Sequence, residues 1–313
     1  MADKIATREA YGKALAEFGV DEKIIVLDAD LSKSTKTDTF KKIYPERFIN
    51  MGIAEANMMS TAAGLATCGK IVFASSFAMF AAGRAYEQVR NSIGYPGLNV
   101  KIGATHAGIS VGEDGASHQC IEDIALMRAI PNMVVISPSD AVESRAAVKA
   151  AIEHNGPVYL RFGRLAVPVL YDEANFKFEI GKGIQVEDGK DVTIIANGLL
   201  VTEAIEARKL LAEQGISARV IDIHTIKPID ADIIIKAAKE TGAIVTAEEH
   251  NILGGLGSAV AEVLVENYPV PMKRVGIEDV FGRSGKPAAL LNLYGLTASN
   301  IAEKAKEVLK KKK

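Results

Sequence analysis

Residues 70–103 read KIVFASSFAMFAAGRAYEQVRNSIGYPGLNVKIG. Residues 70–74 and 98–103 are short runs rich in β-branched and other apolar residues, which is typical of buried strands. Between them, residues 77–93 carry many small and apolar residues, and we expect a helix there. A strand, a helix and a second strand in this order predict two parallel strands joined by a crossover helix.

The same alternation extends in both directions along the chain. We expect further strands at residues 23–28, 133–136 and 158–161 and a short one ending at residue 52, with helices at residues 7–18, 54–67, 119–128 and 141–154. This rhythm predicts a mainly parallel sheet with helices on both faces. We assign it to a first domain, residues 1–165.

The rhythm stops after residue 165. Residues 166–190 contain Pro168 and three glycines without a clear period, so we interpret them as an inter-domain linker. The alternation then resumes, with strands expected at 192–196, 218–222, 243–247 and 273–277 and helices at 199–214, 230–241, 256–267 and from 298 onward. The predicted fold class is therefore α/β, with a second domain at residues 191–313 that is again a mainly parallel sheet flanked by helices.

Composition excludes several classes of protein. Of 313 residues, 48% are apolar and 24% charged, and the net charge is -2. This balance suits a packed soluble protein and gives no reason to expect nucleic acid or a membrane as partner. Two cysteines form neither a disulfide framework nor a zinc pattern, and the first residues lack the apolar stretch of a secretory signal. We expect a cytoplasmic location.

Two glycine-rich segments resemble anion-binding loops. GRSGKP at residues 282–287 has a proline where a phosphate loop has Ser or Thr, and its glycine spacing is wrong. ILGGLG at residues 252–257 opens a predicted helix. It suits either an anion at the helix N-terminus or close packing of a loop against a helix, and the sequence leaves both open.

The segment FINMGIAEAN, residues 48–57, places an acid in an unusual setting. Glu55 falls in the first turn of a helix made largely of Met, Ala, Gly and Leu. Burial among such residues would raise the pKa of the carboxyl group, as is common in functional sites. A purely structural reading is that the acid favours the positive end of the helix dipole.

A denser polar segment, GATHAGISVGEDGASHQ, occupies residues 103–119 and follows a predicted strand. Open α/β sheets bind ligands at the carboxyl ends of their strands. Two histidines, two acids and several glycines in one loop favour a binding or catalytic site over a plain connection. A metal site made of His106, His118 and Cys120 would match no standard spacing, and a structural polar loop is the other alternative.

These two segments resemble transketolase. The pattern T-H-x-x-I-x-V-G-E-D-G-x-x-H-Q is specific to that family, and the resemblance to its C-terminal half covers essentially the whole chain. G-I-A-E at residues 52–55 is shared more widely, with 1-deoxyxylulose-5-phosphate synthase and the beta subunits of 2-oxo-acid dehydrogenases. All of these enzymes use thiamine diphosphate, held between a pyrimidine-binding domain and a domain that binds the diphosphate and its metal ion.

The metal-binding domain of this family carries a Gly-Asp-Gly motif, and none occurs in these 313 residues. The resemblance therefore implies half of a split transketolase. Magnesium or calcium would be held by a partner, the N-terminal subunit, and two copies of each chain would form a heterotetramer. No metal ligand is expected in this chain.

The resemblance also assigns roles to cofactor-binding residues. Glu55 matches the glutamate that hydrogen-bonds the aminopyrimidine ring and favours its imino tautomer. Phe77 and Phe80 match aromatic residues of the pyrimidine pocket, although helix-core packing at i, i+3 spacing is the structural alternative. Asp30 matches a position beside the cofactor.

Other matches concern the sugar. His106, Asp114 and His118 match residues that face it, with His118 handling hydroxyl protons and Asp114 recognising a hydroxyl. The phosphate of the sugar would be held by Arg8, Ser34 and Arg164. Arg161 lies three residues before Arg164 on the same segment, so either arginine suits a structural role instead.

The expected reaction is transfer of a two-carbon ketol unit from a ketose phosphate to an aldose phosphate, as in the pentose phosphate pathway. Ala54 and Ala56 depart from the G-I-R-E-H that is typical of full-length transketolases. This departure keeps two alternatives in view, namely a beta-type subunit of a 2-oxo-acid dehydrogenase and an enzyme like 1-deoxyxylulose-5-phosphate synthase. A non-catalytic assembly subunit is a third.

Overall fold

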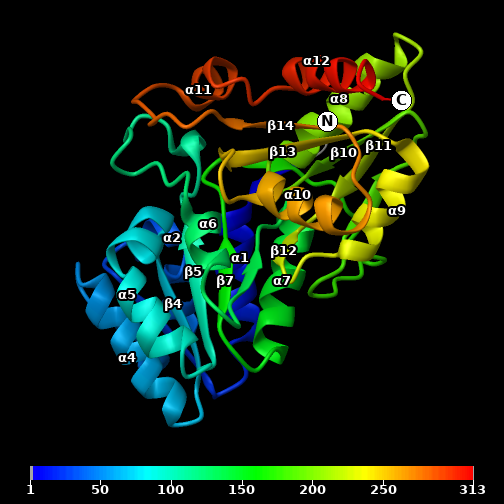
Figure 1. Ribbon diagram of the computed structural model, residues 1–313. Helices are drawn as coiled ribbons and strands as arrows, with labels where there is room; N and C mark the ends of the chain where they lie inside the picture. Colours follow the sequence, from blue (N-terminus) through cyan, green and yellow to red (C-terminus); the bar gives the residue numbers. More distant parts are fainter. Residues whose placement is uncertain (1–2, 313) are drawn as a thin grey trace.

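The computed structural model of the chain describes residues 3–312, and it contains two large sheets packed together (Figure 1). The first has seven strands in the order β12-β6-β7-β5-β4-β2-β3, all parallel except β12. Its strands are β2 (Ile24–Asp28), β3 (Phe48–Asn50), β4 (Ile71–Phe77), β5 (Val100–Thr105), β6 (Val134–Ile136), β7 (Val158–Arg161) and β12 (Thr225–Lys227). The helices of this part are α1 (Thr7–Phe18), α2 (Ser32–Thr35), α3 (Asp38–Ile43), α4 (Glu55–Thr67), α5 (Tyr86–Gln88), α6 (Asp123–Arg128) and α7 (Ala141–Glu153).

The second sheet has five strands in the order β14-β13-β10-β11-β9, parallel except at β9. They are β9 (Ile184–Glu187), β10 (Val192–Ala196), β11 (Ala218–Asp222), β13 (Ile244–Asn251) and β14 (Met272–Ile277). The helices are α8 (Leu200–Ala212), α9 (Ala231–Thr241), α10 (Leu256–Asn267), α11 (Pro287–Leu293) and α12 (Ala298–Leu309). The predicted fold class, α/β with two mainly parallel sheets, is confirmed.

The crossover between β4 and β5 differs from the single helix predicted at residues 77–93. Strand β4 continues to Phe77, and two wide π-helical turns, Met79–Arg84 and Val89–Gly94, flank the short α5. Ala81, Ala82 and Ala85 are fully buried, and such small side chains let the irregular backbone pack closely on its neighbours. π-turns are uncommon and frequently occur at functional sites.

Residues 166–190, which we interpreted from the sequence as an inter-domain linker, contain two short strands. They contain β8 (Ala166–Pro168), which pairs with β1 (Lys4–Ala6), and β9, which forms the edge of the second sheet. Both strands are too short to show a period in the sequence, and both run antiparallel to their neighbours. The domain boundaries near 165 and 190 stay a prediction.

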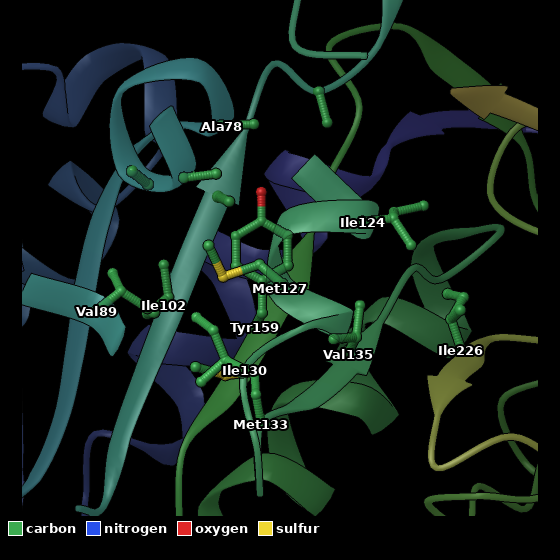
Figure 2. Close-up of a cluster of buried hydrophobic side chains, with 14 of the residues drawn as sticks. Ala78, Val89, Ile102, Ile124, Met127, Ile130, Met133, Val135, Tyr159 and Ile226 are labelled. Carbon is green, nitrogen blue, oxygen red and sulfur yellow. The ribbon is translucent and has the colours of Figure 1, made fainter. Parts of the chain in front are cut away.

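The two halves interlock through strand β12, which leaves the C-terminal half to pair with β6 of the first sheet. Figure 2 shows the consequence, since Ile226 of β12 approaches Val135 of β6 at the side of a continuous apolar cluster around Tyr159. Each large apolar side chain buried in this cluster contributes roughly 1.5–3 kcal/mol. The packing therefore holds the C-terminal half firmly against the sheet that carries the predicted site.

Candidate active site

The carboxyl edge of the first sheet gathers the residues that the sequence singled out. Strands β3, β2, β4, β5 and β7 lie side by side and parallel, so the loops that follow them emerge along one edge. These loops and the first turn of α1 supply Glu55 after β3, Asp30 and Ser34 after β2, Phe77 and Phe80 at the end of β4, His106, Asp114 and His118 after β5, Arg164 after β7, and Arg8 from α1.

Aromatic and imidazole rings from β4 and β5 pack together at this edge. Phe77 stacks on His106 with 3.8 Å between ring centroids, and the edge of His118 meets Phe80 at 5.3 Å. Phe77 and Phe80 are themselves stacked at 6.0 Å. The structure thus brings both predicted histidines and both predicted aromatics into one cluster, and Phe77 belongs to a strand end rather than a helix core.

His106 is buried and adopts a left-handed backbone with φ of 56°. Its Nδ1 lies 2.9 Å from the Thr105 hydroxyl, and its Nε2 lies 3.5 Å from Arg8 Nη1. Burial, together with the charges of Arg8 and Arg164, lowers the pKa of His106 to about 3. The ring is therefore neutral at physiological pH, and it fits its neighbours when Nδ1 donates to Thr105 and Nε2 accepts.

Cations surround this neutral histidine. Arg8, Arg164 and Lys36 all contribute to the lowered pKa of His106. Burial lowers the pKa of Arg8 as well, with a smaller contribution from Arg164 and an opposing one from Glu9. Arg8 Nη1 donates to the Ser34 carbonyl at 2.7 Å, whereas Arg8 Nε is buried and has no hydrogen-bond partner within residues 3–312. Like charges held this close favour an anion between them.

Arg161 and Arg164, between which the sequence left the choice open, differ in burial. Arg161 is 6% exposed and makes a two-pronged pair with Asp123, at 2.8 and 3.2 Å. It is fully engaged inside the protein. Arg164 is 35% exposed, donates to the Val111 carbonyl and lies 3.3 Å from Glu113, so it remains accessible from the site.

Glu55 begins α4, and its side chain is 1% exposed. The surroundings of the carboxylate are not wholly apolar, because Arg84 Nη1 donates to it at 2.9 Å. The guanidinium of Arg84 also lies over the ring of Phe80, 4.5 Å from its centroid. Arg84, which the sequence analysis missed, thus links two predicted cofactor residues. Its position four residues after Phe80 was the only signal available.

Asp30 is exposed, with a left-handed backbone at φ of 64°. Asn50 holds it from the neighbouring strand, since Asn50 Nδ2 donates to Asp30 Oδ1 at 2.9 Å and Asn50 Oδ1 accepts from the Asp30 N–H at 3.1 Å. Asn50 is a second residue that sequence reasoning missed. The pair ties the ends of β2 and β3 together.

The loop after β5 bends through Gly108, Gly112 and Gly115, which have φ of 83°, 89° and 77°. Only glycine adopts such a backbone without strain. The structure leaves Asp114 exposed on this loop, and within residues 3–312 its side chain makes no hydrogen bond or ion pair. His106 and His118 are brought together, but Asp114 does not contact either ring.

The two glycine-rich segments both serve packing. The N–H groups that open α10, from Leu256 and Gly257, donate to the carboxylate of Glu248 at 2.7 and 2.8 Å, so the chain's own acid takes the anion position. At residues 282–287, the Arg283 carbonyl accepts from Gln119 at 2.9 Å, which fastens this segment to the loop after β5.

Neither a metal-binding cluster nor a membrane-spanning helix occurs in residues 3–312. Within residues 3–312, no three His, Cys, Asp or Glu side chains gather in a way that could hold a metal ion. In the same part of the chain, every helix is too short or too polar to cross a membrane.

Comparison with known proteins identifies the family. The family model "Transketolase, pyrimidine binding domain" matches residues 3–169, and "Transketolase, C-terminal domain" matches residues 181–301. The chain therefore belongs to the transketolase family. It corresponds to the C-terminal section of these enzymes, with the pyrimidine-binding and C-terminal domains.

Relatives of similar length support this assignment. A "Putative transketolase C-terminal section" of Methanocaldococcus jannaschii is 55% identical over 97% of this chain and 96% of its own length. The "6-deoxy-6-sulfo-D-fructose transketolase subunit SqwH" of a Clostridium species is 44% identical over 97% and 95%. A solved structure described as "Split gene transketolase, inactive beta4 tetramer" is 57% identical, with a TM-score of 0.92 over 99% of this chain and all of that one.

Proposed function

We propose that this chain is the pyrimidine-binding subunit of a two-chain, thiamine-diphosphate-dependent transketolase. The reaction is transfer of a two-carbon ketol unit from a ketose phosphate to an aldose phosphate, as in the pentose phosphate pathway. The observation that carries the proposal is the cluster in which neutral His106, His118 and the cations Arg8 and Arg164 meet beside Phe77. It offers proton-transfer groups and an anion site at one sheet edge.

The residues present fit the pyrimidine ring of the cofactor. Glu55 supplies a buried carboxylate beside Phe80, and Phe77 stacks on the same ring, so a flat heterocycle would find an acid and aromatic faces together. When bound, thiamine diphosphate supplies the carbon nucleophile. Glu55 would hydrogen-bond the ring, Phe77 and Phe80 would pack against it, and Asp30 would lie beside it.

The sugar would lie over the histidines. His118, which is half-exposed, would accept and return a hydroxyl proton, while His106 stays neutral and offers Nε2 as an acceptor. Arg8, Ser34 and Arg164 would bind the phosphate, and the Ser34 carbonyl also orients Arg8 by accepting from its Nη1 at 2.7 Å. The name of the Clostridium relative refers to a sulfonated sugar, and a sulfonate suits the same kind of cationic site.

Completeness is the second part of the proposal. The chain has no Gly-Asp-Gly motif, and the solved relative is described as an inactive tetramer of its beta chain. We infer that an N-terminal subunit holds the diphosphate and its magnesium or calcium ion, and that two copies of each chain assemble. Cofactor affinity would then rise with assembly, by mass action.

Activity and calorimetry test this proposal. The chain is titrated with thiamine diphosphate and magnesium, first alone and then with the N-terminal subunit, and ketol transfer from xylulose 5-phosphate is measured in both cases. We expect weak binding and no turnover alone, and tight binding with turnover after mixing. Full activity of the chain by itself would refute the split enzyme. Turnover with pyruvate instead of xylulose 5-phosphate would favour a 2-oxo-acid-dependent enzyme.

A further inference from the structure

A carboxylate from the C-terminal half reaches the loop that carries both site histidines. Glu249, near the end of β13, is buried, and its Oε1 accepts from the Ser110 N–H at 2.6 Å. Gly108 presses against the same group, since a Cβ at that position would fall 2.3 Å from the Glu249 Cδ. The backbone between His106 and His118 therefore rests directly on this side chain.

Glu249 is itself held rigidly from the other side. Its backbone carbonyl accepts from Arg161 Nη2 at 2.9 Å, and Arg161 is fixed by the buried Asp123. The support thus runs from the first sheet through Arg161 to β13 and back to the loop. Because every member is buried, the loop has little freedom to shift without breaking these contacts.

We propose that Glu249 is a positioning residue for the reaction, setting where the loop between His106 and His118 lies relative to the sugar. It makes no contact with either histidine, so it acts only through the loop backbone. This inference rests on the proposed function. A displacement of catalytic groups by about 1 Å is enough to lower turnover on the order of 100-fold.

The contact should strengthen as pH rises through neutrality. Burial raises the pKa of Glu249 to about 7, with Asp123 acting in the same direction and Arg161 and the Ser110 N–H opposing it. With the Ser110 hydroxyl, which also lowers the pKa, these are the charged and donor groups that face the carboxyl from α6, β7 and the loop. The ionised form accepts the stronger hydrogen bond, so the loop is held most firmly above pH 7.

The preceding residue provides a matched control. Glu248 is equally buried, but its carboxylate turns to the N-terminus of α10 and accepts from Leu256 and Gly257 within the C-terminal half. Glu248→Gln and Glu249→Gln make the same chemical change at adjacent positions of one strand. Only the second alters the support of the histidine loop.

The experiment compares both variants with the wild type, assembled with the N-terminal subunit. For Glu249→Gln we expect kcat at pH 8 to fall by about 10- to 100-fold with KM for xylulose 5-phosphate changed less than about twofold, and the step in kcat near pH 7 to disappear. Glu248→Gln should lower thermal stability and keep both kcat and the step. Equal kinetic effects in the two variants would overturn the proposal.

Hydrogen–deuterium exchange of the chain alone gives a readout that does not depend on activity. Glu249→Gln should speed exchange at residues 106–118, and Glu248→Gln at residues 252–258. If Glu249→Gln does not fold, wild-type exchange at 106–118, corrected for intrinsic rates, should slow between pH 6 and 8, and a flat profile would overturn the inference. Inactive wild-type enzyme would instead count against the proposed function, whatever the exchange shows.

Discussion

The cluster around His106 and the acid cluster formed by Asp140, Glu143 and Asp222 are both polar and largely buried, and both contain groups with strongly shifted pKa values. The first faces outward through the exposed part of Arg164 and the half-exposed His118. Two of its three cations are ion-paired, Lys36 with Glu9 and Arg164 with Glu113, whereas Arg8 makes no ion pair within residues 3–312.

The acid cluster lies between α7 and β11 and is closed by the chain itself. Asp140 accepts from the N–H groups of Glu143, Leu170 and Tyr171 at 2.8, 2.7 and 3.0 Å. The Tyr171 hydroxyl donates to Asp222 Oδ2 at 2.8 Å, and the Ser139 N–H and hydroxyl donate to Glu143 Oε2 at 2.6 and 2.9 Å. Burial raises the pKa of both Glu143 and Asp222, and the titrations of these neighbouring carboxyl groups are linked.

The comparison distinguishes a candidate ligand-binding site from a polar contact that holds the two halves of the chain together. Most hydrogen-bonding atoms of the acid cluster are satisfied across the two halves of the chain, although Glu143 Oε1 and Asp222 Oδ1 have no partner within residues 3–312. The cluster around His106 differs in its surplus of cations at a sheet edge, where Arg8 Nε is unsatisfied, and this surplus suits a ligand of negative charge. A shifted pKa alone does not distinguish the two.

The largest effect is expected from Glu55→Gln. The amide fits the same space but cannot act as the carboxyl group does toward the aminopyrimidine, so kcat should fall by roughly 100- to 10,000-fold with the fold retained. Exchange of the C2 proton of thiamine diphosphate in the assembled enzyme gives a direct measurement. The matched control is Glu143→Gln, an equally buried acid in the closed cluster, which should leave kcat unchanged. A wild-type exchange rate in Glu55→Gln would remove the assignment.

A second test separates the roles of two residues in the cluster around His106. His118→Ala should lower kcat by about 100-fold or more, because it removes a proton-transfer group. Arg164→Ala should mainly raise KM, because a remote phosphate contact is nearly uniform along the reaction. Steady-state kinetics with phosphorylated and unphosphorylated donors measure both. If Arg164→Ala weakened the two donors equally, its phosphate role would be wrong.

The acid cluster should make the free energy of unfolding depend on pH. Burial raises the pKa of Asp222 from 3.8 in the unfolded chain to about 7. A raised pKa in the folded state means that the stabilisation is fully present below pH 4 and is lost as pH rises through 7, by about 1.4 kcal/mol per unit at most. Denaturant unfolding between pH 5 and 8 measures the loss, which Asp222→Asn should flatten. An unchanged slope in Asp222→Asn would show that this carboxyl is not responsible.

The smallest effect is expected from Tyr171→Phe. Removing one buried hydroxyl donor should lower the free energy of unfolding by about 1–2 kcal/mol and leave kcat and KM unchanged. Tyr268→Phe is the control, since Tyr268 lies on the surface and within residues 3–312 its hydroxyl makes no hydrogen bond. If Tyr171→Phe reduced activity while stability stayed the same, the acid cluster would do more than hold the two halves of the chain together.

Much of the fold was predictable because local patterns of apolar and polar residues indicate where its strands and helices lie. Strands β10 and β11 and helices α1 and α10 begin and end where the alternation of apolar and polar residues placed them. Their periodicity depends on neighbours a few residues away. The site loops were predictable for a related reason, since parallel strands carry their ligand-binding loops at one edge. The roles proposed for Glu55 and His118 came from motif resemblance, and they stay predictions.

Other features were decided only by tertiary structure. No local pattern indicates that β12 crosses to the first sheet, that Arg84 reaches Glu55, or that Glu249 supports a loop more than a hundred residues away. Arg161 and Arg164 are alike in sequence, and only the folded structure shows that Arg161 is buried in an ion pair while Arg164 stays partly exposed. The sequence determined the elements and the edge where they converge, because periodicity is a short-range property. Which side chains satisfy one another and which remain open depends on contacts between distant segments, and those exist only once the chain has folded.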